Sequence, residues 1–81
     1  MIEDTSVFDI SLIKRALISE TLKEISADLE ERGYNSINQI VGYLMSGDPG
    51  FISSYKDARK KITALERSEI ISLILSEHLD K

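Results

Sequence analysis

The chain has 81 residues, of which 42% are hydrophobic, 30% are charged and one is proline, a composition that predicts a single folded soluble domain with a modest core. It contains no cysteine, which excludes disulfides and thiolate metal sites, so its stability must come from packing or from a partner subunit. The formal net charge of −4 disfavours binding to phosphate backbones.

The first ten residues hold three acids and show no helical spacing of apolar side chains. We expect residues 1–10 to form a flexible N-terminal regulatory tail and residues 11–81 to form a helical domain. The apolar Val7, Phe8 and Ile10 are candidates for docking the tail onto that domain. The segment carries no basic leader, and the apolar cluster at 70–75 is too short to cross a bilayer, so we expect a cytoplasmic protein.

A first amphipathic helix is predicted over residues 11–32. Ile18, Leu22, Ile25 and Leu29 follow the i, i+4, i+7, i+11 spacing of a single helix face. Gly33 is expected to end the helix, because glycine adopts the left-handed conformation without steric cost.

A second helix is predicted over residues 36–46, with Asn35 as its N-cap. Gly42 inside it weakens the helix by about 1 kcal/mol relative to alanine, which indicates a close helix crossing at that point. The apolar positions of this helix have i, i+3, i+4, i+7 spacing and are expected to face the core: Ile37, Ile40, Val41 and Leu44.

Asp48 and Pro49 are typical of the N-cap and first residue of a short helical turn. We expect the two apolar residues that follow, Phe51 and Ile52, to close the core. A third helix is predicted over residues 58–65, capped by Asp57.

The third helix carries three consecutive cations that are expected to lie largely in water: Arg59, Lys60 and Lys61. A fourth helix is predicted from residue 66 or 67 to residue 79. Its apolar residues cover more than one face, so one face should meet another subunit in a symmetric homodimer. The interface would bury whichever of Ile71, Leu75 or Leu79 the core of the single chain leaves out. The fold class is therefore an all-α bundle of about four helices plus one short helical turn.

An enzyme is not expected, and neither is a cofactor or a metal. The one histidine, His78, is interpreted as a surface residue near a helix C-terminus. No nucleophile and base can be paired, and the carboxylates lack metal-ligand spacing. An alternative is a small helix-turn-helix-like DNA-binding regulator, with Lys56, Arg59 and Lys60 as phosphate contacts.

Four stretches of the sequence carry a recognisable pattern: residues 33–44, the Ser-Gly-Asp-Pro turn at 46–49, the triplet at 57–59, and residues 65–67 with 69–70. Together they resemble the signature of the IreB/ReoM family of small regulatory phosphoproteins of Gram-positive bacteria. The resemblance covers about residues 5–80. It implies an all-helical homodimer whose N-terminal tail is phosphorylated on threonine by a membrane Ser/Thr kinase with PASTA repeats. It further implies control of peptidoglycan synthesis, cell-wall stress and antibiotic resistance through the proteolytic stability of the enolpyruvyl transferase.

By the same resemblance, Thr5 is the phosphorylation site, with Ser6 as the alternative. Arg59 and Arg67 match arginines of the family pattern and are interpreted as partner-binding residues. The implied partners are the kinase, its phosphatase and an effector linked to regulated proteolysis. A phosphate on Thr5 should either repel an acidic partner or move toward Lys56, Arg59 and Lys60.

The chain departs from the family pattern at three places. Residues 53–55 lie where the family usually has Pro followed by Arg-His, so Ser53 replaces the proline and Ser54 the arginine. Thr63-Ala64 replaces a common basic pair. Ser36 replaces a common proline. The first two changes remove positive charge from the expected partner surface.

Overall fold

A computed structural model describes residues 11–80. The described chain is all-α and contains no strand, which confirms the predicted fold class. A second short 3-10 turn, not expected from the sequence, leads directly into the third helix. The elements in order are α1 (Leu12–Glu31), α2 (Ser36–Ser46), η1 (Pro49–Phe51), η2 (Tyr55–Asp57), α3 (Ala58–Thr63) and α4 (Arg67–Leu79).

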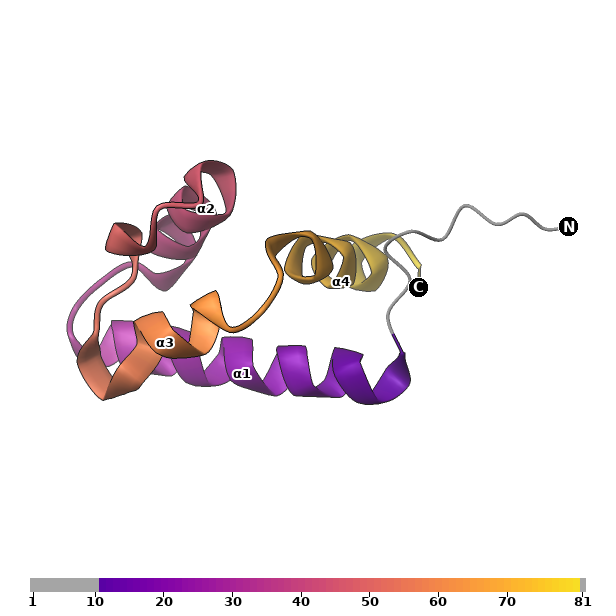
Figure 1. Cartoon of the computed structure of the whole chain (residues 1–81), viewed down its shortest axis with the longest axis horizontal. Helices are drawn as coiled ribbons and strands as arrows, with labels where there is room; N and C mark the ends of the chain where they lie inside the picture. Colours follow the sequence, from indigo (N-terminus) through magenta and orange to yellow (C-terminus); the bar gives the residue numbers. More distant parts are fainter. Residues whose placement is uncertain (1–10, 81) are drawn as a thin grey trace, which may run out of the picture.

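The long helix α1 is the base on which the other helices pack (Figure 1). Helix α3 and the turn η2 lie against its C-terminal half, and α4 lies along its N-terminal half. The start of α1 and the end of α4 are at the same end of the molecule's long axis. The helix α2 contacts both α1 and η1.

Three helix starts have side-chain caps: those at Asn35 and Asp48 were predicted, and the one at Ser11 was not. Ser11 Oγ accepts a hydrogen bond from Lys14 N at 3.2 Å, and Asn35 Oδ1 accepts one from Asn38 N at 3.0 Å. In η1, Asp48 Oδ1 accepts from Gly50 N at 2.8 Å. These bonds satisfy backbone N–H groups that have no partner inside the helix.

The start of α3 differs from the prediction. Asp57 is the N-cap by position, but its side chain makes no capping hydrogen bond. It has a φ of 62°, and the preceding Lys56 has a φ of 51°, so the chain turns through two successive left-handed residues before α3. The helix then ends at Thr63 rather than at residue 65.

The core lies between α1, α3 and the first half of α4. The apolar face predicted for α1 is confirmed, because Ile18, Ile25 and Leu29 are buried and Leu22 packs against them. The remaining buried apolar residues come from the rest of the chain: Tyr43, Ile52, Ala58, Ile62, Ile70 and Leu73.

The orientation predicted for α2 is wrong in part. Ile37 and Val41 are 73% and 50% exposed, Ile40 and Leu44 are half-buried, and Tyr43 is the residue that faces the core, with 6% exposed. Helix α2 is apolar on more than one side, so its spacing alone could not show which side the rest of the chain would cover.

Gly42 does allow a close approach, but of a side chain rather than of another helix. A Cβ atom at Gly42 would lie 2.5 Å from Cδ1 of Phe51, so the aromatic ring occupies the space left by the missing side chain. Ile52 is fully buried, as predicted, whereas Phe51 packs on the surface of α2 and stays partly exposed. The Gln39 side chain fixes this turn by donating to Phe51 O at 2.9 Å.

The last helix is covered on one side only. Ile70 and Leu73 are buried, while Ile71, Leu75 and Leu79 remain exposed, so the core of the single chain leaves out all three candidate interface residues. No helix within residues 11–80 has the length and apolar character needed to cross a membrane.

Candidate docking surface

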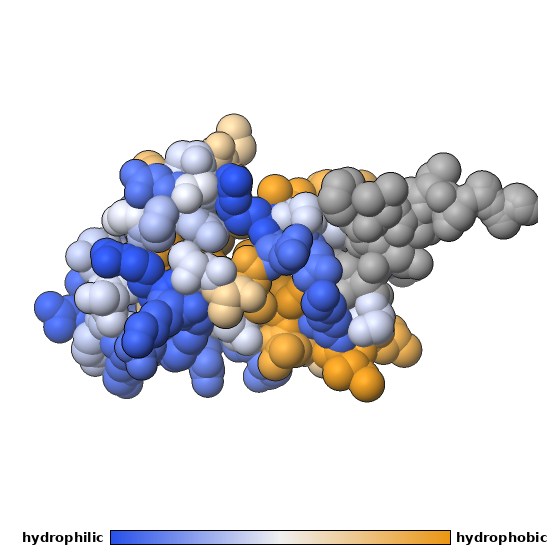
Figure 2. Space-filling model, in the orientation of Figure 1, coloured by the Kyte–Doolittle hydropathy of each residue, from blue (hydrophilic) through white to orange (hydrophobic). Residues whose placement is uncertain are grey.

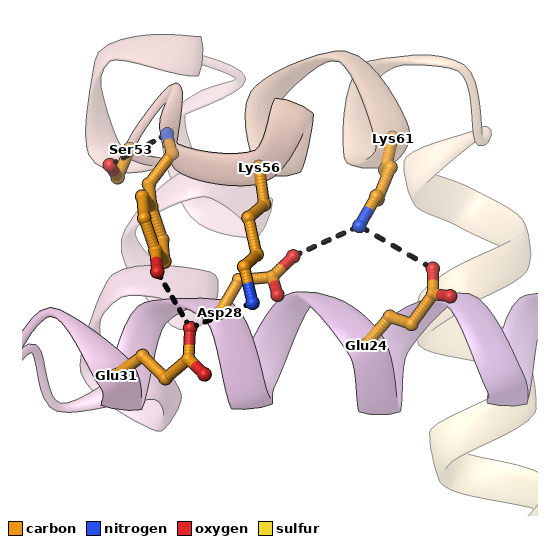
Figure 3. Close-up of polar contacts among 7 residues, drawn as sticks. Glu24, Asp28, Glu31, Ser53, Lys56 and Lys61 are labelled. Carbon is orange, nitrogen blue, oxygen red and sulfur yellow. Dashed lines mark hydrogen bonds and ion pairs between the residues drawn. The ribbon is translucent and has the colours of Figure 1, made fainter.

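Two groups of charged side chains tie α1 to η2 and α3 (Figure 3). In the first, Glu31 Oε1 accepts a hydrogen bond from the Tyr55 hydroxyl at 2.9 Å and pairs with Lys56 Nζ at 3.1 Å. The Tyr55 ring also lies near two cations, with Arg32 Cζ at 5.0 Å and Lys56 Nζ at 5.5 Å from its centre.

These contacts shift the protonation of all three groups. The Tyr55 hydrogen bond, followed by Lys56, lowers the pKa of Glu31. The same carboxylate raises the pKa of Tyr55 and of Lys56. The group is therefore held as a carboxylate, a neutral phenol and an ammonium at neutral pH.

In the second group, Lys61 Nζ lies 3.0 Å from Asp28 Oδ2 and 3.5 Å from Glu24 Oε1. The Asp28 hydrogen bond raises the pKa of Lys61. The expectation that Lys61 lies largely in water is wrong, because its side chain is 29% exposed and points toward α1. The spacing of charged and apolar residues along α3 could not reveal that a nearly buried aspartate of α1 faces Lys61.

These pairs weaken the DNA-binding alternative. Lys56 and Lys61 form ion pairs with acids of α1. Within residues 11–80 this leaves Arg59 and Lys60 as the cations of that cluster that have no ion pair. Helix α3 has only six residues, fewer than two turns, and is too short to lie in a major groove as a recognition helix does.

Arg59, predicted to bind a partner, also has a partner inside the chain. Its Nε donates to Ile52 O at 2.9 Å, and its backbone N–H donates to Ser53 O at 3.1 Å. Arg59 thus holds the segment that follows η1 against the start of α3. The guanidinium has other N–H donors that bind no residue in the described part of the chain.

Arg67, the second residue predicted to bind a partner, caps the C-terminal end of α2. Its Nη1 donates to Leu44 O at 3.1 Å, one of the last carbonyls of α2, which have no partner within the helix. Its guanidinium lies over Gly47, where a Cβ atom would come within 2.9 Å of Arg67 Cζ. Gly47 has a φ of 76° and ends α2 in the left-handed conformation.

The structure therefore brings the two arginines to one segment, the end of α2 and the turn η1. Both are exposed, and each holds a backbone carbonyl of that segment. Sequence reasoning missed this internal role, because nothing in the spacing of Arg59 or Arg67 indicates which carbonyl it will meet. Each guanidinium keeps N–H donors beyond its bond to a carbonyl, and such donors suit a carboxylate.

An apolar groove lies between α1, α2 and α4. It is lined almost only by apolar atoms, and its main contributors are Leu22, Ile37, Ile40, Val41, Leu44 and Ile74. Space-filling shows further apolar side chains over α4 and the N-terminal half of α1, whereas the other half of this face is mostly hydrophilic (Figure 2). An exposed apolar groove of this kind is a candidate interaction site.

Three further predictions concern single sites. Thr5 lies outside the described residues, and so does Ser6. His78 is exposed in the last turn of α4, as expected. Within residues 11–80, no three histidine or acidic side chains are grouped as metal ligands would be.

A small all-α domain with paired surface charges, an exposed apolar groove and two anchored arginines has the features of a protein that works through its contact surfaces. The model of the IreB regulatory phosphoprotein family matches residues 3–80, almost the whole chain. The protein therefore belongs to the family of IreB regulatory phosphoproteins.

Proposed function

We propose that this protein is a non-enzymatic cytoplasmic regulator that a PASTA-type Ser/Thr kinase phosphorylates on Thr5. In this role it controls peptidoglycan synthesis, and with it cell-wall stress and antibiotic resistance, by changing the proteolytic stability of the enolpyruvyl transferase. The observation that carries the proposal is the family match over residues 3–80, which includes Thr5. A phosphatase that reverses the modification completes the regulatory cycle.

Arg59 and Arg67 are proposed to bind the effector that leads to proteolysis. Both guanidinium groups are exposed and fixed by backbone carbonyls, so they would lose little side-chain entropy when a partner carboxylate binds. Ser54 and Thr63, where the family is usually basic, lie near Arg59 in the chain and make this surface depend more heavily on the two arginines.

The active form is proposed to be a homodimer, as the sequence predicts, but with a second copy covering the groove between α1, α2 and α4 in place of the interface predicted at Ile71, Leu75 and Leu79. Ile37, Val41 and Ile74 are exposed in the single chain although they belong to strongly apolar helices. A twofold interface would bury the same residues from both copies. Sedimentation at micromolar concentration should show a dimer, and Val41→Glu should shift it to monomer; a wild-type monomer would exclude this arrangement.

The phosphorylation site is tested directly by mass spectrometry after incubation with the kinase. Thr5→Ala should abolish the label, while Ser6→Ala should leave it intact. Label that persists in Thr5→Ala would place the modified residue elsewhere.

The regulatory role is tested by the half-life of the enolpyruvyl transferase after translation is stopped. Thr5→Ala and the double variant Arg59→Ala/Arg67→Ala should each change the half-life relative to wild type. Lys60→Ala is the matched control, because it removes a cation from the same region without breaking a side-chain bond to the backbone. An unchanged half-life in both test variants would refute the proposed role.

A further inference from the structure

The outward face of α4 forms an open groove of about 450 Å³ that the described chain leaves uncovered. Ile71, Leu75 and Leu79 recur every four residues along it, and the small side chains of Ser68 and Ser76 form its other side. The exposed fractions of the three apolar residues are 40%, 50% and 69%. This groove is separate from the one between α1, α2 and α4, since the two have no lining residue in common.

The described chain begins beside this groove. Lys14, in the first turn of α1, pairs with Glu69 of α4 at 2.9 Å, and Glu69 is adjacent in sequence to Ser68 at one end of the groove. The start of α1 and the end of α4 also lie at the same end of the molecule (Figure 1). Whatever precedes Ser11 therefore enters from a point close to α4.

Ten residues precede Ser11. An extended segment of ten residues spans up to about 35 Å, whereas the 13 residues of α4 are only about 20 Å long. The tail is thus long enough to follow the whole groove. Its last four residues include Val7, Phe8 and Ile10, which are the side chains that an apolar groove would bind.

The charges at the end of α4 oppose a phosphate in this position. Asp80 lines the end of the groove and is exposed, and the helix C-terminus carries a partial negative charge. Phosphothreonine brings a charge of about −1.5 to −2 at neutral pH. Thr5 lies three residues before Phe8, so a phosphate on it would be held near Asp80 and the helix C-terminus if Phe8 remained bound.

We propose that residues 7–10 of the same chain occupy the α4 groove, with Phe8 as the main contact, and that phosphorylation of Thr5 releases them. The first part stands on the groove and the tail sequence alone. The second part rests on the proposed function, because it takes Thr5 as the modified residue. Release uncovers the apolar face of α4 for another protein.

The chain has no tryptophan, so a Phe8→Trp variant of the full-length protein gives a single fluorescent reporter of tail burial. The emission of this tryptophan should be blue-shifted, because most molecules would have the tail docked. Acrylamide should quench the tryptophan at least about twofold less than in a Phe8→Trp/Leu75→Glu variant, in which docking is lost. Phe8→Trp/Met45→Glu is the matched control, because Met45 is 82% exposed and lines neither groove. It should quench like Phe8→Trp alone.

Three results would overturn the docking. The tryptophan could be fully quenched in the Phe8→Trp protein, its quenching could respond to Met45→Glu as strongly as to Leu75→Glu, or its protection could rise with protein concentration. The last result would show that a second copy covers α4, because docking within one chain does not depend on concentration.

The release step is tested by placing phosphothreonine at position 5 in the Phe8→Trp protein, which needs no kinase. Quenching should rise to the value of the Leu75→Glu variant and should fall again in high salt, where the repulsion is screened. Unchanged quenching would refute release while leaving the docking intact. Failure of the kinase to label Thr5 would instead refute the proposed function and not the docking.

Discussion

The close contact between Gly47 and Arg67 should make the free energy of unfolding sensitive to any side chain added at position 47. Gly47→Ala adds a Cβ atom to a residue with a φ of 76° and places it within 2.9 Å of Arg67 Cζ. The left-handed conformation costs alanine about 1 kcal/mol. The guanidinium must also move away, which breaks its bond to Leu44 O and costs about 1 kcal/mol more. The total is about 2 kcal/mol.

Gly33→Ala is the matched control for the backbone term. Gly33 also ends a helix and has a φ of 82°, but no atom lies within 4 Å of the added Cβ position. We therefore expect this variant to lose only about 1 kcal/mol. In a domain of this size, 1 kcal/mol corresponds to a change in Tm of about 4–8 °C, so the two variants are readily distinguished.

The assay is urea and thermal unfolding at one protein concentration, since any dimer would make Tm depend on concentration. In an Arg67→Ala background, the cost of Gly47→Ala should fall to that of Gly33→Ala, because the clash and the bond are both gone. Equal costs for the two glycine variants in the wild type would refute the proposed contact, as would an excess cost that persists without Arg67.

Three further predictions concern the core and the polar contacts. Gly42→Ala should destabilise the fold by about 1–2 kcal/mol, because the cost of displacing the Phe51 ring exceeds the gain in helix propensity. In a Phe51→Ala background the same change should stabilise the fold. Destabilisation in that background would contradict the reasoning. Ile52→Ala should cost about 2–5 kcal/mol in urea unfolding, since the side chain is fully buried, and a loss below 1 kcal/mol would mean that it does not close the core. Tyr55→Phe should lower Tm at pH 7, because it removes the hydrogen bond that lowers the pKa of Glu31 in the folded protein. A lowered pKa stabilises the fold at pH values above the pKa of the unfolded chain, and this stabilisation is lost as the carboxylate protonates. The Tm difference should therefore shrink below pH 4.5. A Tm difference independent of pH would exclude Glu31 as the cause.

Local signals in the sequence predicted most of the helix boundaries. Asn35, Asp48 and Gly33 act within a few residues of themselves, through a cap or a left-handed backbone, and such interactions can be predicted from neighbours in the chain. The exception is Asp57, which has the right residue type but a left-handed conformation that turns its side chain away from capping.

Long-range choices could not be predicted in the same way. Whether Ile37 or Tyr43 of α2 faces the core depends on how the helix meets α1 and η1, and both sides of α2 are apolar enough to be buried. The partners of Lys61 and Arg67 lie 33 and 23 residues away in the sequence. Helical periodicity shows which residues share a face, but it does not show which residues of another element that face will meet.

Helix α4 packs against the core mainly through its first half, so local opening of the domain should begin at the end of this helix. Its two fully packed residues, Ile70 and Leu73, lie in its first half, and every apolar side chain beyond them is at least 44% exposed. Amide hydrogens near Leu73 should therefore exchange only with opening of the core, while those of the last two turns should exchange through local fraying whenever the α4 groove is empty. Any protein surface that settles on the end of α4 would reverse this gradient, so the exchange rate of those few amides reports whether the helix is occupied.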